Sequence, residues 1–368
     1  MPISAVDTIS LAVEHTKQQL FKPFRFGQWT RLAIVGLLAG ELGSGGGFNG
    51  SNFNFPRHPG ASGHGFPSGL GGIDPALLAG LIAVLVVTAF VFTIIFMYIS
   101  SVMRFILFDS VIAKECHIRQ GWSRRQTEGW RYFLWKLFYV FLTVAGFVLL
   151  IGIPAAFAYG VGWFKEPREH LIPLVLGGVF LFFLFLFFMV AIAVIFVLTK
   201  DFVVPQMALE SISAWEGWRR LWPMIQSEME AYAGYIGMKI LMAIGAGIVV
   251  GIATLILGLI IAIPTVALSI LAILTGKSAG LTWNAYTITL AVVVGSVLLA
   301  IFLYVIALIS VPVIVFFPAY SIYFFAARYP ALSAVVYPAP PVTLQIPTGT
   351  APPPYEPPPL PPSPAPTG

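Results

Sequence analysis

The residues best suited to chemistry in this sequence are its five histidines, its carboxylates and its single cysteine, and none of them forms a catalytic pattern. The histidines lack the His-Glu-x-x-His spacing with which a helix holds zinc. The lone thiol, Cys116, cannot form a disulfide within the chain. We therefore predict a protein that is not an enzyme and that binds no metal and no cofactor.

Two glycine-containing stretches resemble nucleotide-binding motifs without their context. Gly45-x-Gly47-x-x-Gly50 matches a dinucleotide fingerprint, but it follows an apolar run instead of a strand. The Gly-Lys-Ser at 276–278 lacks the upstream glycine of a phosphate loop. Neither match indicates a nucleotide site.

The carboxylates lie mostly between apolar runs, where they reach water. We expect Glu41 near the outer end of the first membrane helix, and Lys239 close enough to the inner surface to extend into water. Ion-coupled transporters usually keep an ionisable group deep among their helices, and the sequence shows none. This disfavours a transporter, although Ser, Thr and Tyr side chains can also line a transport path.

Composition identifies the elements that carry these residues. Of 368 residues, 58% are hydrophobic and only 10% are charged, whereas soluble domains are about 25% charged. These values exclude a soluble enzyme and a disordered chain, and they predict a polytopic membrane protein. The formal net charge of +5 fits basic residues beside membrane helices, so we expect no nucleic-acid partner.

The apolar runs predict an all-α bundle of about six transmembrane helices arranged as three hairpins. A span needs about 20 apolar residues, and the candidate runs are 26–42, 76–103, 132–159, 171–198, 232–274 and 284–325. The run 232–274 contains Pro264 and allows either two tight spans or one. Because no polar turn divides it, we favour one span to about Ile263, followed by a kinked or interfacial extension to Leu274.

Basic residues are distributed unevenly over this topology. With six spans, 16 Lys and Arg residues fall on the face that holds both termini, and 4 fall on the other. Because cytoplasmic loops carry the excess of basic residues, we predict an inner-membrane (plasma-membrane) protein with cytoplasmic N- and C-termini.

The chain divides into three regions. Residues 1–25 predict a cytoplasmic amphipathic helix, and residues 26–330 the transmembrane domain. Within that domain, 43–75 is expected to be a glycine-rich outer loop. Residues 331–368 are expected to be a proline-rich, disordered cytoplasmic tail.

Two cytoplasmic segments combine indole rings with arginines. Ser213 and Glu216 fit a capping box at the start of one segment. Indoles favour the membrane–water interface, and nearby basic residues attract anionic headgroups. We therefore predict that lipid or partner contacts are made by Trp215, Trp218, Arg219, Arg220 and Trp222, and by Arg124, Arg125, Trp130 and Arg131. A purely structural linker is the alternative.

Motifs in the same segments resemble a known membrane family. The stretch Phe202–Glu210, followed by Ala214–Leu221, and the exit Phe317–Tyr320 leading to Arg328 are similar to poorly characterised bacterial multi-pass proteins. Those proteins are related to the membrane domain of glycerophosphoryl diester phosphodiesterases. The catalytic barrel has no room in this chain, so the resemblance implies a membrane fold without hydrolase activity.

These observations favour a non-catalytic scaffold, accessory or membrane-homeostasis factor that touches anionic lipid headgroups. A transporter or lipid-handling protein is the alternative, and an intramembrane enzyme ranks third. Small-residue stripes at Gly36-x-x-x-Gly40 and Ala243-x-x-x-Gly247-x-x-x-Gly251 predict close helix packing, either within the chain or in a homo-oligomer. A protein partner is a further possibility.

Overall fold

A computed structural model describes residues 4–41, 75–164, 168–278 and 285–338. The predicted glycine-rich loop and most of the predicted tail lie outside these residues. Within them the chain is helical and contains no strand. The helices are α1 (Asp7–Phe21), α2 (Phe26–Ala39), α3 (Pro75–Ala113), α4 (Ile118–Phe147), α5 (Ile153–Gly160), α6 (Leu171–Leu198), α7 (Val204–Glu210), α8 (Ala214–Ser227), α9 (Met229–Ser278), α10 (Ala285–Ala326) and α11 (Pro330–Val336). Two π-helical turns, η2 (Val148–Gly152) and η3 (Thr199–Val203), continue α4 and α6.

Five helical stretches in the described residues are long and apolar enough to cross a membrane. They are Ala76–Ala113, Ile118–Gly160, Leu171–Glu210, Met229–Ala272 and Tyr286–Ala326. The long run around Pro264 lies in one continuous helix, α9, which extends past Ile263 to Ser278. The predicted first span is not among the five, because α2 has only 14 residues and a span needs about 17 or more.

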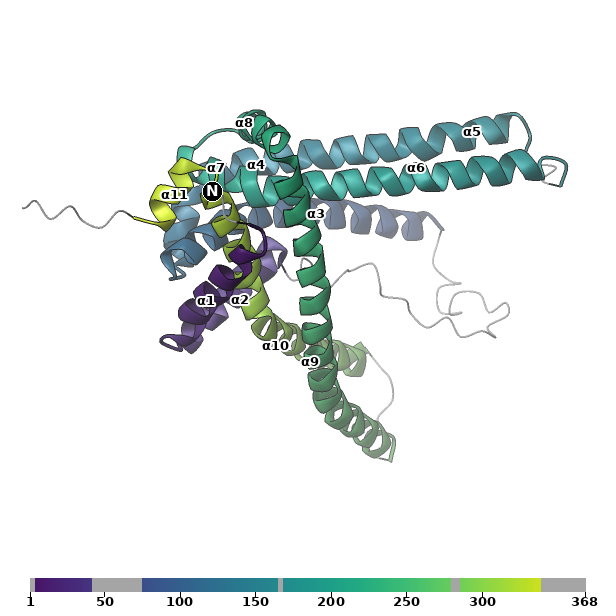
Figure 1. Ribbon diagram of the computed structural model, residues 1–368. Helices are drawn as coiled ribbons and strands as arrows, with labels where there is room; N and C mark the ends of the chain where they lie inside the picture. Colours follow the sequence, from purple (N-terminus) through teal and green to yellow (C-terminus); the bar gives the residue numbers. More distant parts are fainter. Residues whose placement is uncertain (1–3, 42–74, 165–167, 279–284, 339–368) are drawn as a thin grey trace, which may run out of the picture.

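The side chains bury one another at one end of the molecule. Helices α1 and α11, the first and last of the described chain, both lie at this end (Figure 1). We call this region the head and define it as residues 4–41, 100–136, 198–239 and 306–338. It holds one continuous core, in which Phe105, Phe202, Tyr235, Tyr320 and Phe324 are the large members. All buried side chains of the described residues except Ala158 belong to the head.

The remaining described helices extend from the head and are exposed. We call residues 75–99, 137–197 and 240–305 the arms (Figure 1). In the most apolar 18 residues of each candidate span, between 0% and 11% of residues are buried within the protein. Apolar helices whose backbone bonds are satisfied internally are suited to lipid surroundings. The arms are therefore long and apolar enough to cross a membrane.

Glycines show where helices approach closely. A Cβ on Gly36 would lie 2.5 Å from the side chain of Ile314 in α10, so this glycine of the first predicted stripe packs within the chain, whereas nothing lies within 4 Å of a Cβ on Gly40. In the arms, a Cβ on Gly146 would lie 2.5 Å from the ring of Phe188, so α4 and α6 approach closely there. The stripe on α9 behaves differently, because no atom lies within 4 Å of a Cβ on Gly251.

Helix α2 lies antiparallel to the final turns of α3. At its start Gln28 donates to the carbonyl of Lys114 (2.6 Å), and near its end Ala39 accepts from Arg104 (2.8 Å). Residues 75–99 of α3 continue for about 37 Å beyond this contact at 1.5 Å per residue. Helix α2 thus belongs to the head, where it lies beside the last turns of α3.

Candidate functional site: a buried ionic cluster in the head

Five charged side chains from four separate parts of the chain meet inside the head. They are Glu41, Arg104, Lys200, Asp201 and Lys239, and each is 1–8% exposed. We call them the ionic cluster. Two sequence-based expectations are therefore wrong: Glu41 does not reach water, and Lys239 does not extend to the surface. These charges are buried in the head, at the ends of the long apolar helices and not midway along them.

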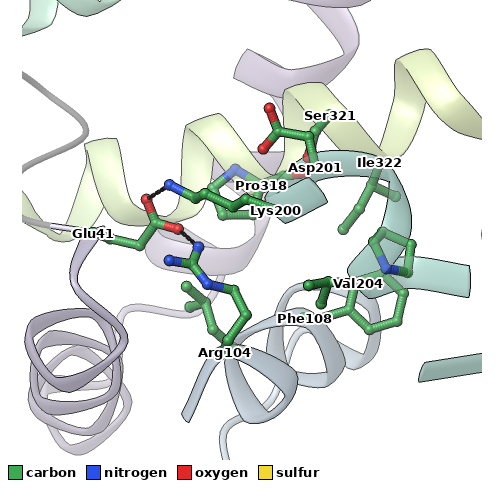
Figure 2. Close-up of a pocket in the computed structure, with 11 residues that line it drawn as sticks. Glu41, Arg104, Phe108, Lys200, Asp201, Val204, Pro318, Ser321 and Ile322 are labelled. Atoms are coloured by element: carbon green, nitrogen blue, oxygen red, sulfur yellow. Dashed lines mark hydrogen bonds and ion pairs between the residues drawn. The ribbon is translucent and has the colours of Figure 1, made fainter. Parts of the chain in front are cut away.

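Glu41 bridges two cations. Helix α2 ends at Gly40, whose φ of +79° is a left-handed conformation that glycine adopts without strain. The turn directs Glu41 between Arg104 of α3 and Lys200 of η3, and each carboxylate oxygen accepts from one of them (Figure 2). Arg104 also donates to the carbonyl of Ala39, which ties the end of α2 to α3.

Asp201 forms the second half of the ionic cluster. Its carboxylate accepts from the ammonium group of Lys239 and from the hydroxyl of Tyr235 (2.9 Å), both on α9. The Lys239 ammonium also lies 5.8 Å from the ring centre of Tyr235 and 5.9 Å from that of Phe317. Aromatic faces attract cations at such distances, so Lys239 is held by a charge and by two rings.

The π-helical turn η3 supplies neighbouring residues of opposite charge. Lys200 and Asp201 are adjacent in sequence, and both are buried in the head. A π turn adds a residue to a helical turn, and such turns occur often at functional sites. Helix α8 packs on this turn, where the indole of Trp218 donates to the hydroxyl of Thr199 (3.0 Å). A Cβ on Gly217 would lie 2.7 Å from Val203, which shows how closely the two elements approach.

The charges of the ionic cluster do not balance. Three cations face two carboxylates, and a fourth cation, the partly buried Lys136, donates to Ser100 (3.2 Å) one turn before Arg104. Removing charges from water is costly unless partners compensate them. The surplus of positive charge is the feature of the ionic cluster that calls for an explanation.

A small cavity adjoins the same residues. Its volume is about 20 Å³, enough for one water-sized group. The polar lining comes from Glu41, Arg104, Lys200, Asp201 and Ser321, and the rest is apolar (Figure 2). The cavity therefore brings an incoming polar atom next to both signs of charge.

The predicted contact residues of α8 divide between two faces. Trp215 and Trp222 are 74% and 56% exposed, and Arg219 lies between them on the same exposed face. Trp218 instead packs inward. Arg220 is exposed but pairs with Glu210 and Glu216. Ser213 caps the helix by accepting from the backbone N–H of Glu216 (3.3 Å), which is one half of the predicted capping box. The Glu216 carboxylate pairs with Arg219 and Arg220.

The second predicted segment, on α4, is partly structural. Arg125 is buried and forms a two-point ion pair with Asp109, with both distances 2.7 Å, so it is unavailable to lipid. Arg131 donates to the carbonyl of Ser211, which links α4 to the loop before α8. Arg124 and Trp130 remain exposed. The structure thus joins the two predicted segments and leaves part of each accessible.

The described residues contain no group of three or more His, Cys, Asp or Glu side chains placed to hold a metal ion. Cys116 is buried, and burial raises the pKa of its thiol. A raised thiol pKa lowers the thiolate fraction and with it the reactivity.

The sequence does not predict the ionic cluster, because its members lie far apart along the chain. Arg104, Lys200 and Lys239 each adjoin a long apolar run, and Glu41 follows one. A charge in such a place is costly unless it has a buried partner. That cost was the available signal, but the sequence does not show which charges pair.

Comparison with known proteins identifies a family for this chain but no function. No curated protein and no solved structure matches the chain. The comparisons show no link to the phosphodiesterase membrane domain that its motifs resemble. A family model does match residues 3–335, which include nearly all of the described helices. The chain therefore belongs to a family of unknown function (DUF7544).

Proposed function

We propose that the protein is a non-catalytic integral membrane protein whose head lies at the headgroup layer of the cytoplasmic leaflet, where it binds lipid headgroups. Its role is that of a membrane scaffold or accessory factor. The observation that carries this proposal is the exposed stripe of Trp215, Arg219 and Trp222 on α8.

The lengths of the arms support this placement of the head at the membrane surface. Arg104 lies 28 residues beyond Ala76, and Lys239 lies 33 residues before Ala272. At 1.5 Å per residue these helices extend about 42 and 50 Å from the ionic cluster. The hydrocarbon core is about 30 Å thick, so each arm is long enough to cross it while the head remains at the surface.

Helix α8 presents suitable chemistry at that surface. Indole rings favour the interface because the ring is apolar and its N–H stays hydrated. Arg219 lies between the two indoles and is 76% exposed at its side chain, although its Nε lies 3.5 Å from a Glu216 carboxylate oxygen. The exposed guanidinium suits a lipid phosphate. Because α8 packs on η3, the stripe stays at a fixed height above the ends of the arms.

Transport is the alternative that the ionic cluster strengthens, because buried charges are often found along ion pathways. The cluster lies at the end of the arms instead of midway along them, which favours headgroup contact. A flux or lipid-scrambling assay in reconstituted vesicles separates the two. Activity that is lost when the cluster is altered would replace our proposal with transport.

The direct test is quenching of tryptophan fluorescence by lipids brominated near the headgroup end of their chains. In reconstituted vesicles, the double variant W215F/W222F should lose much of the quenchable fluorescence of the wild type. The matched variant W218F removes an inward-facing indole of the same helix and should leave that fraction nearly unchanged. An equal quenchable fraction in the wild type and the double variant would refute the proposed placement.

A further inference from the structure

We propose that the ionic cluster is a recognition site for a phosphate group, with one phosphate oxygen entering the cavity between Arg104 and Lys200. This inference rests on the proposed placement of the head and names the chemical group that the head recognises.

Unused hydrogen-bond donors are the first argument. An ammonium group has three N–H donors, and Lys200 and Lys239 each use one of them in the described contacts. Arg104 donates to Glu41 and to Ala39, which leaves part of its five-donor fork unused. The cations therefore present more donors than the two carboxylates accept.

Charge is the second argument. With three buried cations and two buried carboxylates, the ionic cluster gains from one added anion. A phosphate oxygen carries negative charge and accepts several hydrogen bonds, and Arg and Lys both donate strong charge-assisted hydrogen bonds to phosphate. An added carbonyl or water would fill the space but would leave the charge unbalanced.

Size and access are the third argument. The cavity of about 20 Å³ takes one water-sized atom, which corresponds to a single phosphate oxygen and not to a whole phosphate. Arg104 and Lys200 are buried, and each keeps 8% of its surface accessible, so a phosphate oxygen would reach them through the mouth of the cavity. The rest of the phosphate would stay at the mouth, with its substituents outside.

The depth of the ionic cluster suggests where the phosphate comes from. A site at the end of the arms lies where lipid phosphates are concentrated, and a free phosphate in the cytoplasm reaches the same level. Both sources offer the same chemistry, and competition between them distinguishes one from the other.

The experiment uses the full chain purified in a neutral detergent. At constant ionic strength, inorganic phosphate should raise the melting temperature, whereas chloride should not. Lys200→Gln should weaken the apparent affinity for phosphate about tenfold or more, and Lys200→Arg should retain most of it. Lys17→Gln, which changes an exposed lysine on α1, is the matched control and should behave as the wild type.

A second variant separates binding from folding. Glu41→Gln removes the carboxylate that competes for Arg104 and Lys200, so this variant should be less stable in chloride and should bind phosphate more tightly than the wild type. A residue with a purely structural role would lose stability without that gain. If phosphate stabilises the wild type no more than chloride does, or if Glu41→Gln shows no added response, the inference is wrong.

Lipid adducts show whether the bound phosphate belongs to a lipid headgroup or is free phosphate. Native mass spectrometry should show phosphatidylglycerol bound to the wild type and reduced in Lys200→Gln. If inorganic phosphate displaces the lipid, the site takes a headgroup; if phosphate binds and leaves the lipid in place, the site takes free phosphate. Either result supports a phosphate site, and absence of both would overturn it. Failure here leaves the fluorescence test of head placement unaffected, so the two proposals can fail separately.

Discussion

The head and the arms are built from the same kind of helix but are stabilised in different ways. In the head, aromatic side chains and ion pairs bury one another around Phe202 and the ionic cluster. In the arms, large apolar side chains such as Phe187 (71% exposed) and Leu85 (65% exposed) face outward. Water would strongly disfavour that second surface, whereas lipid does not. The contrast shows which part of the chain depends on internal packing and which depends on the membrane.

Of the changes proposed here, breaking the ionic cluster should destabilise the head most. Glu41→Gln leaves Arg104 and Lys200 buried without their carboxylate, and we expect a loss of about 3–5 kcal/mol in the free energy of unfolding in phosphate-free buffer. Equilibrium unfolding of the purified protein measures it. Glu14→Gln, which changes an exposed carboxylate on α1, should lose less than about 0.5 kcal/mol. Equal losses in the two variants would show that the ionic cluster does not stabilise the head.

A glycine pair tests packing in the two regions. In the head, a Cβ on Gly129 would lie 2.6 Å from the side chain of Val102 and 3.1 Å from its Cα. Gly129→Ala should therefore cost about 1–3 kcal/mol. In the arms, nothing lies within 4 Å of a Cβ on Gly178, so Gly178→Ala should be neutral or slightly stabilising. Thermal unfolding in detergent compares them, and a larger loss for Gly178→Ala would reverse the comparison.

Acid should weaken the head through His15. The Nε2–H of this buried imidazole donates to the carbonyl of Val111 (2.9 Å), and Nδ1 accepts from the hydroxyl of Tyr323 (3.0 Å). Burial, and then the charge of Lys114, lower its pKa below the usual 6.5, while contacts with Val111 and Gln19 oppose the shift. The unfolded chain then binds a proton at a pH where the folded head does not.

Stability should therefore fall as the pH drops below about 6.5, by at most about 1.4 kcal/mol per pH unit for this one group. Above that pH, His15 is neutral in both states and contributes no pH dependence. His15→Gln should flatten the melting temperature profile between pH 7 and 5.5. The same slope in the wild type and the variant would exclude His15 as the cause.

The arms could be predicted from sequence better than the head. Apolar length predicted the long helices α3, α4, α6, α9 and α10, and the capping pattern predicted that Ser213 caps α8. Both predictions use only residues that are close together in sequence. The pairing of Glu41 with Lys200 could not be predicted in this way, because the two residues are 159 apart. A π turn, for which there is no reliable sequence signal, directs Lys200 inward. Helix α2 was assigned to the membrane from its apolar residues, which instead pack on α3 and α10 in the head.

Cysteine labelling tests the division into head and arms most directly. In a Cys116→Ser background, single cysteines replace Arg124 and Trp215 in the head and Leu85, Leu186 and Ile256 in the arms. A membrane-impermeant maleimide should label the two head positions in inside-out vesicles but not in intact cells. The arm positions should react only after the membrane is dissolved in denaturing detergent. Labelling of the arm positions at the rate of the head positions, in intact membranes, would contradict the account.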